Sequence, residues 1–135
     1  MSAPDRFVLD THPLIWHLAG RSDRLGKEAR AVLRRIDSGR SLGLIPAIVL
    51  AELAYLSEKG RVSLSLLDVL AEIDRGENFQ LVPLTREQLE ELPYLTVIPE
   101  IHDRLIVAVA RIHNACLITK DQDIHLSNLV TVVWD

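Results

Sequence analysis

The sequence predicts an α/β fold of three layers, in which helices cover both faces of a mainly parallel sheet. Short aliphatic runs alternate with segments whose apolar residues recur every three or four positions. Short buried runs between amphipathic helices are typical of parallel strands, because such strands are covered on both faces. The chain has no internal repeat and no low-complexity tract. Strands that alternate with helices in this way favour the three-layer architecture.

The predicted strands are short runs rich in valine, isoleucine and leucine. In chain order they are Phe7–Leu9, Leu42–Ile45, Leu81–Val82, Ala115–Ile118 and Val130–Val133.

Helical periodicity predicts the segments between these strands. The first helix begins near Thr11, because threonine is a common cap and Pro13 is tolerated in a first turn, and it stops at Gly20. Apolar residues at three- and four-residue spacing predict a second helix over 27–38. Four more are expected: from Pro46 to Gly60, around Leu66–Ile73, over 85–92, where Pro93 limits the helix, and from Asp103 to Asn114.

Size and composition indicate a single domain over residues 1–135. Hydrophobic residues make up 48% of the chain and charged residues 25%, which is ordinary for a globular protein. The N-terminal residues lack a basic segment followed by an apolar stretch, and no apolar run reaches the length of a membrane span. We therefore expect a cytoplasmic protein without membrane contact.

Charge is unevenly distributed along the chain. The net charge of −4 is unusual for a nucleic-acid binder, yet seven basic residues crowd between Arg21 and Arg40. A local basic surface would permit the approach of a polyanion. A solvated helix face explains these basic residues equally well.

Four acidic residues lie where predicted elements end or begin. Asp10 and Asp121 follow aliphatic strands, Asp103 lies at the start of the sixth helix, and Glu52 lies inside the third. Sites in parallel α/β folds form at the carboxyl ends of strands. Clustered carboxylates need protons or cations to offset their repulsion, and their oxygens suit Mg²⁺ and Mn²⁺. The sequence therefore predicts a divalent-metal site formed by Asp10, Glu52, Asp103 and Asp121.

Each acid also has a structural explanation. Asp10 and Asp103 are favourable caps for the helices that follow them, and Asp121 and Asp123 suit a turn. Glu52 fits this explanation least, since an unpaired carboxylate in a mostly apolar helix is costly to bury. Other chemistries lack their motifs, because the histidines show no zinc-type spacing and the chain has no GxSxG or glycine-rich phosphate loop.

Four segments form an ordered set that spans most of the chain. They are Val8–Trp16, Ala51–Leu53 followed by Lys59–Arg61, His102–Ala108 and Leu117–Asp121. This set resembles a PIN domain, and more narrowly a VapC-type ribonuclease toxin of a type II toxin–antitoxin system. The resemblance implies an Mg²⁺- or Mn²⁺-dependent endoribonuclease, usually a homodimer, that cleaves structured RNA such as tRNA or rRNA. A cognate antitoxin protein would block its site.

The resemblance also implies roles for individual residues. Asp10, Glu52, Asp103 and Asp121 match the acidic quartet that binds metal and supports catalysis, while Thr11 and Thr119 match hydroxyl positions near the metal, and Asp123 is an accessory acid. One departure is that many relatives have Asp-Pro-x-Asp-Arg where this chain has Glu100-Ile101-His102-Asp103-Arg104. Glu100 would replace the first acid with a longer side chain.

Three further residues are candidates for contacts with RNA or protein. Arg104 and Arg111, seven residues apart on one helix, are expected to hold RNA phosphates, although Arg111 also suits a solvated role. Trp16 is expected either at an interface with an antitoxin or second protomer or in the core.

Two other functions are consistent with the same acids. One is a non-catalytic PIN-like module that binds RNA or protein. The other is a phosphoacceptor domain, which is disfavoured because a single acid, Asp10, follows the first strand and Lys120 is adjacent to Asp121.

Overall fold

Five parallel strands form one sheet in the computed structural model, which describes residues 5–76 and 78–135. The strands lie in the order β3-β2-β1-β4-β5, and every pair of neighbours is parallel. The predicted α/β fold is therefore confirmed, with a sheet that is parallel throughout. The strand bounds are β1 Arg6–Leu9, β2 Leu42–Pro46, β3 Phe79–Val82, β4 Cys116–Ile118 and β5 Val132–Val133.

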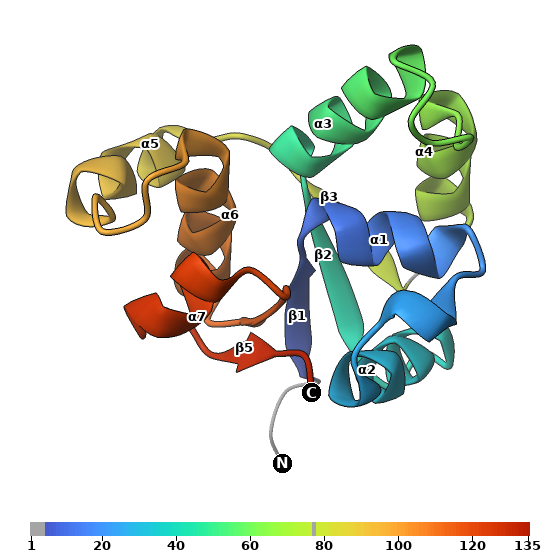
Figure 1. Cartoon of the computed structure of the whole chain (residues 1–135), viewed down its shortest axis with the longest axis horizontal. Coiled ribbons are helices and arrows are strands. Elements are labelled where there is room, and N and C mark those ends of the chain that lie inside the picture. The colour runs from blue at the N-terminus through green and yellow to red at the C-terminus, as the bar shows by residue number, and fades with distance from the viewer. Residues whose placement is uncertain (1–4, 77) are drawn as a thin grey trace.

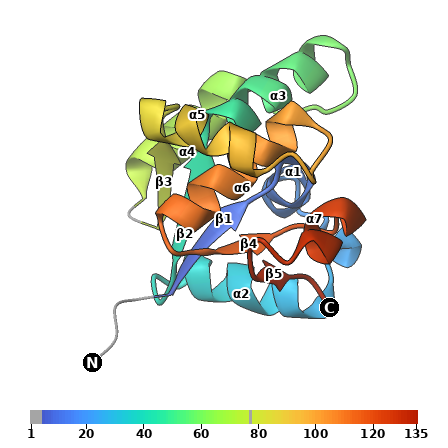
Figure 2. The ribbon, with the colours of Figure 1, turned by 90° about the vertical axis from the view of Figure 1, so that its left-hand side faces the viewer.

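Helices cover both faces of this sheet (Figure 1). The helices α1 to α4 lie on one side of the strands, and Figure 2 shows α5 and α6 in front of the other side. A short helix, α7, precedes β5. No helix within the described ranges is long and apolar enough to cross a membrane. The bounds are α1 Thr11–Leu18, α2 Lys27–Asp37, α3 Ala47–Glu58, α4 Leu66–Arg75, α5 Arg86–Glu91, α6 Ile101–Ile112 and α7 Gln122–Ser127, with 3₁₀ turns η1 Ser22–Arg24 and η2 Leu92–Tyr94.

The core is mainly aliphatic and centres on the inner strands. Val8 and Leu9 of β1 and Leu117 and Ile118 of β4 have no solvent exposure. These residues lie between two helical layers, so both faces of their strands are apolar, as the continuous aliphatic runs indicate. The well-packed middle of the sheet therefore holds the residues that follow β1 and β4 in fixed positions.

Near the acidic residues, one helix boundary differs from the sequence prediction and one short helix was not predicted. The sixth helix, α6, begins at Ile101 with Glu100 at its N-cap position, so Asp103 lies within its first turn and is not its cap. Helix α7 was not predicted, because six residues are too few to show a helical period. Asp121 caps α7 through a hydrogen bond from the Ile124 amide to Oδ1 (3.0 Å).

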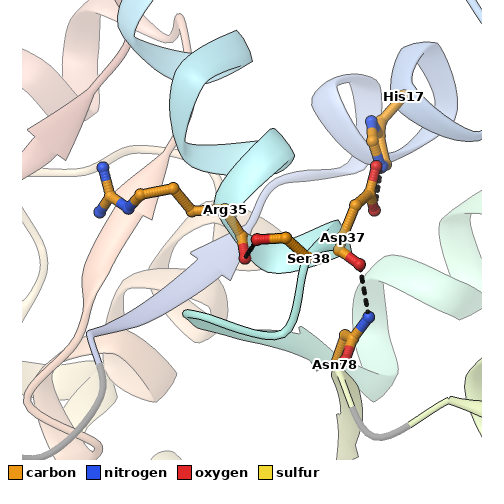
Figure 3. A network of polar contacts seen from close by, with 5 residues as sticks. All are labelled: His17, Arg35, Asp37, Ser38 and Asn78. Carbon is orange, nitrogen blue, oxygen red and sulfur yellow. Dashed lines mark hydrogen bonds and ion pairs between the residues drawn. The ribbon is translucent and has the colours of Figure 1, made fainter.

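A polar network ties the ends of α1 and α2 to the start of β3 (Figure 3). Asp37 lies between His17 and Asn78: its Oδ1 is 3.0 Å from His17 Nε2, and its carbonyl oxygen accepts a hydrogen bond from Asn78 Nδ2 (3.1 Å). The Ser38 hydroxyl donates to the Arg35 carbonyl (3.0 Å) and closes the last turn of α2. A cavity of about 440 Å³ opens beside this network, and none of the four predicted metal ligands lines it.

Candidate functional site

The carboxyl ends of β1 and β4 hold the centre of the acidic cluster. Asp10 follows β1 and Thr119 follows β4, and the Asp10 amide donates to the Ile118 carbonyl (3.1 Å), which fixes the two strand ends side by side. The chain leaves β1 for β2 on one side, while β4 lies on the other side. The crevice between β1 and β4 is thus the switch point at which open parallel sheets bind ligands.

Asp10 is held by two donors from different parts of the chain. The Thr119 hydroxyl donates to Oδ2 (2.7 Å), and the Thr11 amide donates to Oδ1 (2.8 Å). Burial raises the pKa of the Asp10 carboxyl; the two hydrogen bonds lower it, and the charges of Glu52 and Asp121 raise it further. The structure therefore combines the two explanations of Asp10, because the residue caps α1 and also belongs to an acidic cluster.

Glu52 reaches the cluster from α3. Its Oε1 accepts a hydrogen bond from the hydroxyl of Thr11 (3.0 Å), and Thr11 is only 1% exposed. A buried hydroxyl thus orients this carboxylate, as the neighbouring Thr119 hydroxyl orients Asp10. The two threonines, which the sequence placed near the metal only by resemblance, are hydrogen-bonded to two of the predicted ligands.

Asp121 is connected to the same threonine as Asp10. Its backbone amide donates to Thr119 Oγ1 (3.1 Å), and Thr119 is fully buried. The hydroxyl of Thr119 therefore accepts from one acidic residue and donates to another. This arrangement fixes the spacing between the segment after β1 and the segment after β4.

Asp103 shows the strongest effect of the cluster. Its pKa rises from 3.8 to about 7, first because of burial and then because of the charges of Asp10, Asp121, Glu100 and Glu52. All three other predicted ligands thus contribute to the electrostatic potential at Asp103. The fold thus brings acids from four different segments of the chain close enough for their charges to act on Asp103.

The donor set fits a hard divalent cation in type and charge. Carboxylate and hydroxyl oxygens are the ligands such cations prefer, and a cation would offset the repulsion that raises the pKa values of Asp10 and Asp103. Within residues 5–76 and 78–135, however, no three histidine, cysteine or acidic side chains are already grouped closely enough to hold a metal ion. The acids are gathered, but their oxygens do not yet converge on one point.

The two predicted accessory acids differ in their relation to the cluster. Glu100 is exposed at the start of α6, and its charge contributes to the raised pKa of Asp103. Asp123 is exposed in the first turn of α7 and is absent from the groups that raise the pKa of Asp10 or Asp103. Glu100 therefore lies nearer to the site than Asp123 does, in electrostatic terms.

Both arginines predicted to hold phosphates make structural contacts. Arg104 donates to the carbonyl groups of Ile98 and Pro99 and so fixes the segment before α6. Arg111 forms an ion pair with Glu91 (3.2 Å) and donates to the Leu129 carbonyl (2.8 Å). These contacts give each guanidinium a structural role, whereas the sequence suggested a phosphate contact for both and, as the alternative for Arg111, a solvated role.

A group of aromatic and basic side chains surrounds Trp16, and the sequence had suggested only Trp16 itself. The ring centroids of His12 and Trp134 lie 5.6 Å and 6.2 Å from that of Trp16. Lys120 Nζ and Arg24 Cζ lie 5.4 Å and 6.0 Å from the same centroid. We call these five residues the Trp16 ledge. The four-residue spacing of His12 and Trp16 was a usable signal, whereas the contributions of Trp134 and Arg24 depend on the tertiary fold.

A family model covers most of the chain, and solved structures share its fold. The family model described as PIN domain matches residues 7–128. No curated protein matches the chain at a significant level. The fold is similar to that in the crystal structure of VapBC2 from Rickettsia felis bound to a DNA fragment from its promoter, with a TM-score of 0.65, 20% identity and coverage of 96% of this chain and 99% of that chain.

Two further solved structures share the fold. A toxin–antitoxin complex from Klebsiella pneumoniae matches with a TM-score of 0.64 and 19% identity, over 92% of this chain and 94% of that chain. A domain of a functionally unknown protein from Methanocaldococcus jannaschii matches with a TM-score of 0.54 and 22% identity, over 95% and 89% of the two chains.

Proposed function

Because the chain belongs to the PIN-domain family, we propose that it is a metal-dependent endoribonuclease and the toxin of a type II toxin–antitoxin pair. PIN domains are typically metal-dependent nucleases, and the family predicted from the sequence is confirmed. The observation that most supports the activity is the gathering of four carboxylates at the carboxyl edge of the sheet, where Asp103 has a pKa of about 7.

The proposed ligands of Mg²⁺ or Mn²⁺ are Asp10, Glu52, Asp103 and Asp121, with Glu100 and Asp123 as accessory acids. A bound divalent cation would supply activation of a water molecule for attack on the phosphodiester. The chain supplies orientation, because Thr119 holds Asp10 and Thr11 holds Glu52 through hydroxyl hydrogen bonds. Hydrolysis by water requires no protein nucleophile.

The proposed partners follow from the family and from the structural neighbours. Two of these neighbours were crystallised as toxin–antitoxin assemblies, which supports a cognate antitoxin that covers the site in this protein too. We further propose a homodimer that acts in the cytoplasm on structured RNA such as tRNA or rRNA.

Cleavage of a pool of structured RNAs by purified, antitoxin-free protein tests the activity. We expect products with Mg²⁺ or Mn²⁺ and none with EDTA. Asp10→Asn should abolish cleavage, because it removes a charge at the centre of the cluster. Asp74→Asn is the matched control, since Asp74 is an exposed acid on α4. Equal cleavage by the wild type and a folded Asp10→Asn variant would refute the assigned site.

A non-catalytic module that binds RNA or protein is the second candidate. It is favoured by one observation, the lack of a converged set of three metal ligands among the described residues. Such a module would bind RNA equally well in Mg²⁺ and in EDTA and would leave every RNA of the pool intact. Calorimetric titration with Mn²⁺ separates the two, because the nuclease requires a cation site that Asp10→Asn weakens.

A further inference from the structure

We propose that the Trp16 ledge binds an unpaired base of the RNA beside the scissile phosphate, with Trp16 as the stacking platform. This inference rests on the proposed nuclease function and deepens it, because it assigns a base-stacking subsite next to the acidic cluster. The ledge is formed by His12, Trp16 and Trp134 with the cations of Lys120 and Arg24.

The ledge begins at the same two segments that hold the acids. His12 is the second residue after Asp10, in the first turn of α1, and Lys120 lies between Thr119 and Asp121. The backbone and hydroxyl contacts of Asp10 with Ile118 and Thr119 fix these segments side by side. We therefore expect the nucleotide next to a phosphate bound at the acids to reach the ledge.

The charges of the ledge suit a polyanion. Lys120 and Arg24 are both exposed, and neither takes part in an ion pair within the described part of the chain. Their cationic groups lie near the Trp16 ring from two different elements. Aromatic rings beside basic side chains are the usual combination for unpaired nucleotides, because the rings stack on bases and the cations contact phosphates.

A cavity with acidic residues on its wall borders the ledge at Lys120 and Trp134. This cavity of about 360 Å³ is lined by Thr119, Lys120 and Trp134, and also by Glu28 and Asp135. Two carboxylates on its wall disfavour a phosphate there, but they can accept hydrogen bonds from base amino groups. The cavity meets the ledge at Lys120 and Trp134, so we assign the base to the Trp16 ring beside it and the phosphate to the exposed cations of Lys120 and Arg24.

Packing holds Trp134 in place before any ligand binds. The Trp134 carbonyl accepts a hydrogen bond from the Ala29 amide (3.0 Å) in the first turn of α2. Gly26 permits this approach, because a Cβ atom there would lie 2.2 Å from the Trp134 carbonyl oxygen. Trp16 is likewise partly buried against the core. A rigid aromatic pair loses little conformational freedom when a base stacks on it.

Intrinsic fluorescence tests the ledge directly, because both tryptophans of the chain belong to it. The probe is a short unstructured RNA added to the full-length protein in EDTA, so that no cleavage occurs. We expect quenching of tryptophan fluorescence and roughly 10-fold weaker binding of an abasic oligonucleotide of the same length, as expected for one stacked base. A fully paired RNA duplex should bind no better than the abasic strand.

Variants separate stacking from charge and from misfolding. Trp16→Leu should remove the preference for bases, and Trp16→Phe should retain most of it. Lys120→Gln, at an exposed position, should weaken the binding of every oligonucleotide. It should also reduce the slope of log affinity against log salt concentration by the amount expected for about one phosphate contact. Tyr94→Leu is the matched control, because Tyr94 is 77% exposed in η2, which packs with α5 and α6.

Different experimental results would refute the stacking proposal and the nuclease proposal. Base-dependent quenching without metal-dependent cleavage supports the ledge and refutes the nuclease. Cleavage that folded Trp16→Leu leaves unchanged, with equal binding of RNA and abasic strand, refutes the ledge and leaves the nuclease intact. If Trp16→Leu instead changes only the dimer or the affinity for a protein partner, the ledge is a protein interface and the proposal is overturned.

Discussion

Replacement of Asp103 by asparagine tests the electrostatic account of the site. The pKa of Asp103 in the folded protein is about 7, against 3.8 for an unperturbed carboxyl. Folding therefore favours the protonated form, and the free energy of unfolding must fall as pH rises from 3.8 through 7. Below pH 3.8 ionisation of Asp103 no longer lowers the free energy of unfolding, because Asp103 carries its proton in both the folded and the unfolded chain.

The size of this effect follows from the raised pKa and the partial exposure of the side chain. One pKa unit corresponds to about 1.4 kcal/mol, which sets an upper limit of about 4 kcal/mol at pH 8. Asp103 is only half-buried, so solvent screens its repulsion by neighbouring acids. We expect a loss of about 1–2 kcal/mol between pH 5 and pH 8.

Urea unfolding in EDTA at several pH values measures this loss. The difference between the wild type and Asp103→Asn isolates the contribution of Asp103, because all other titratable groups are the same in both proteins. Asp103→Asn should be more stable than the wild type at pH 8. Its free energy of unfolding should also fall less than that of the wild type as pH rises. Saturating Mn²⁺ should reverse the wild-type decline, since a cation favours the ionised acids. Identical pH profiles for both proteins would refute the reasoning.

Three further substitutions test individual contacts. Thr119→Val should cost about 1–3 kcal/mol in urea unfolding and weaken Mn²⁺ binding in calorimetry, because it leaves Asp10 Oδ2 without its donor, whereas Thr119→Ser should restore both. Gly26→Ala should lower stability by about 1–3 kcal/mol in thermal unfolding, since its Cβ would overlap Trp134. Arg104→Ala should cost about 1 kcal/mol of stability and leave the salt dependence of RNA binding unchanged, because Arg104 contacts carbonyl groups; a reduced salt slope would restore it as a phosphate contact.

Local patterns predicted most of the secondary structure. The aliphatic runs gave β1, β2 and β4 nearly to the residue, because strands buried on both faces are continuously apolar. β3 was longer than predicted: Gln80 and Leu81 are exposed on this edge strand, so its sequence does not form an apolar run. The start of α6 was also missed, since Glu100 caps it without a side-chain hydrogen bond.

The candidate site was less completely predictable than the fold. Position after a strand identified Asp10 and Asp121, and the cost of burial drew attention to Glu52. The hydrogen bond between Thr119 and Asp10 joins residues 109 positions apart, and only the order of the strands reveals such a pair. The contact between the Trp134 and Trp16 rings was likewise not predictable from the sequence, because it depends on where the chain after β5 lies against α2.

The pairing of β1 with β4 determines when the acidic cluster forms during synthesis. β1 emerges early from the ribosome, but its neighbour β4 and the Thr119 hydroxyl follow more than one hundred residues later. Contacts of such long sequence separation form late, because closing the intervening loop is entropically costly. A nascent chain therefore lacks the complete acidic centre until β4 and Thr119 have left the ribosome and paired with β1 and Asp10.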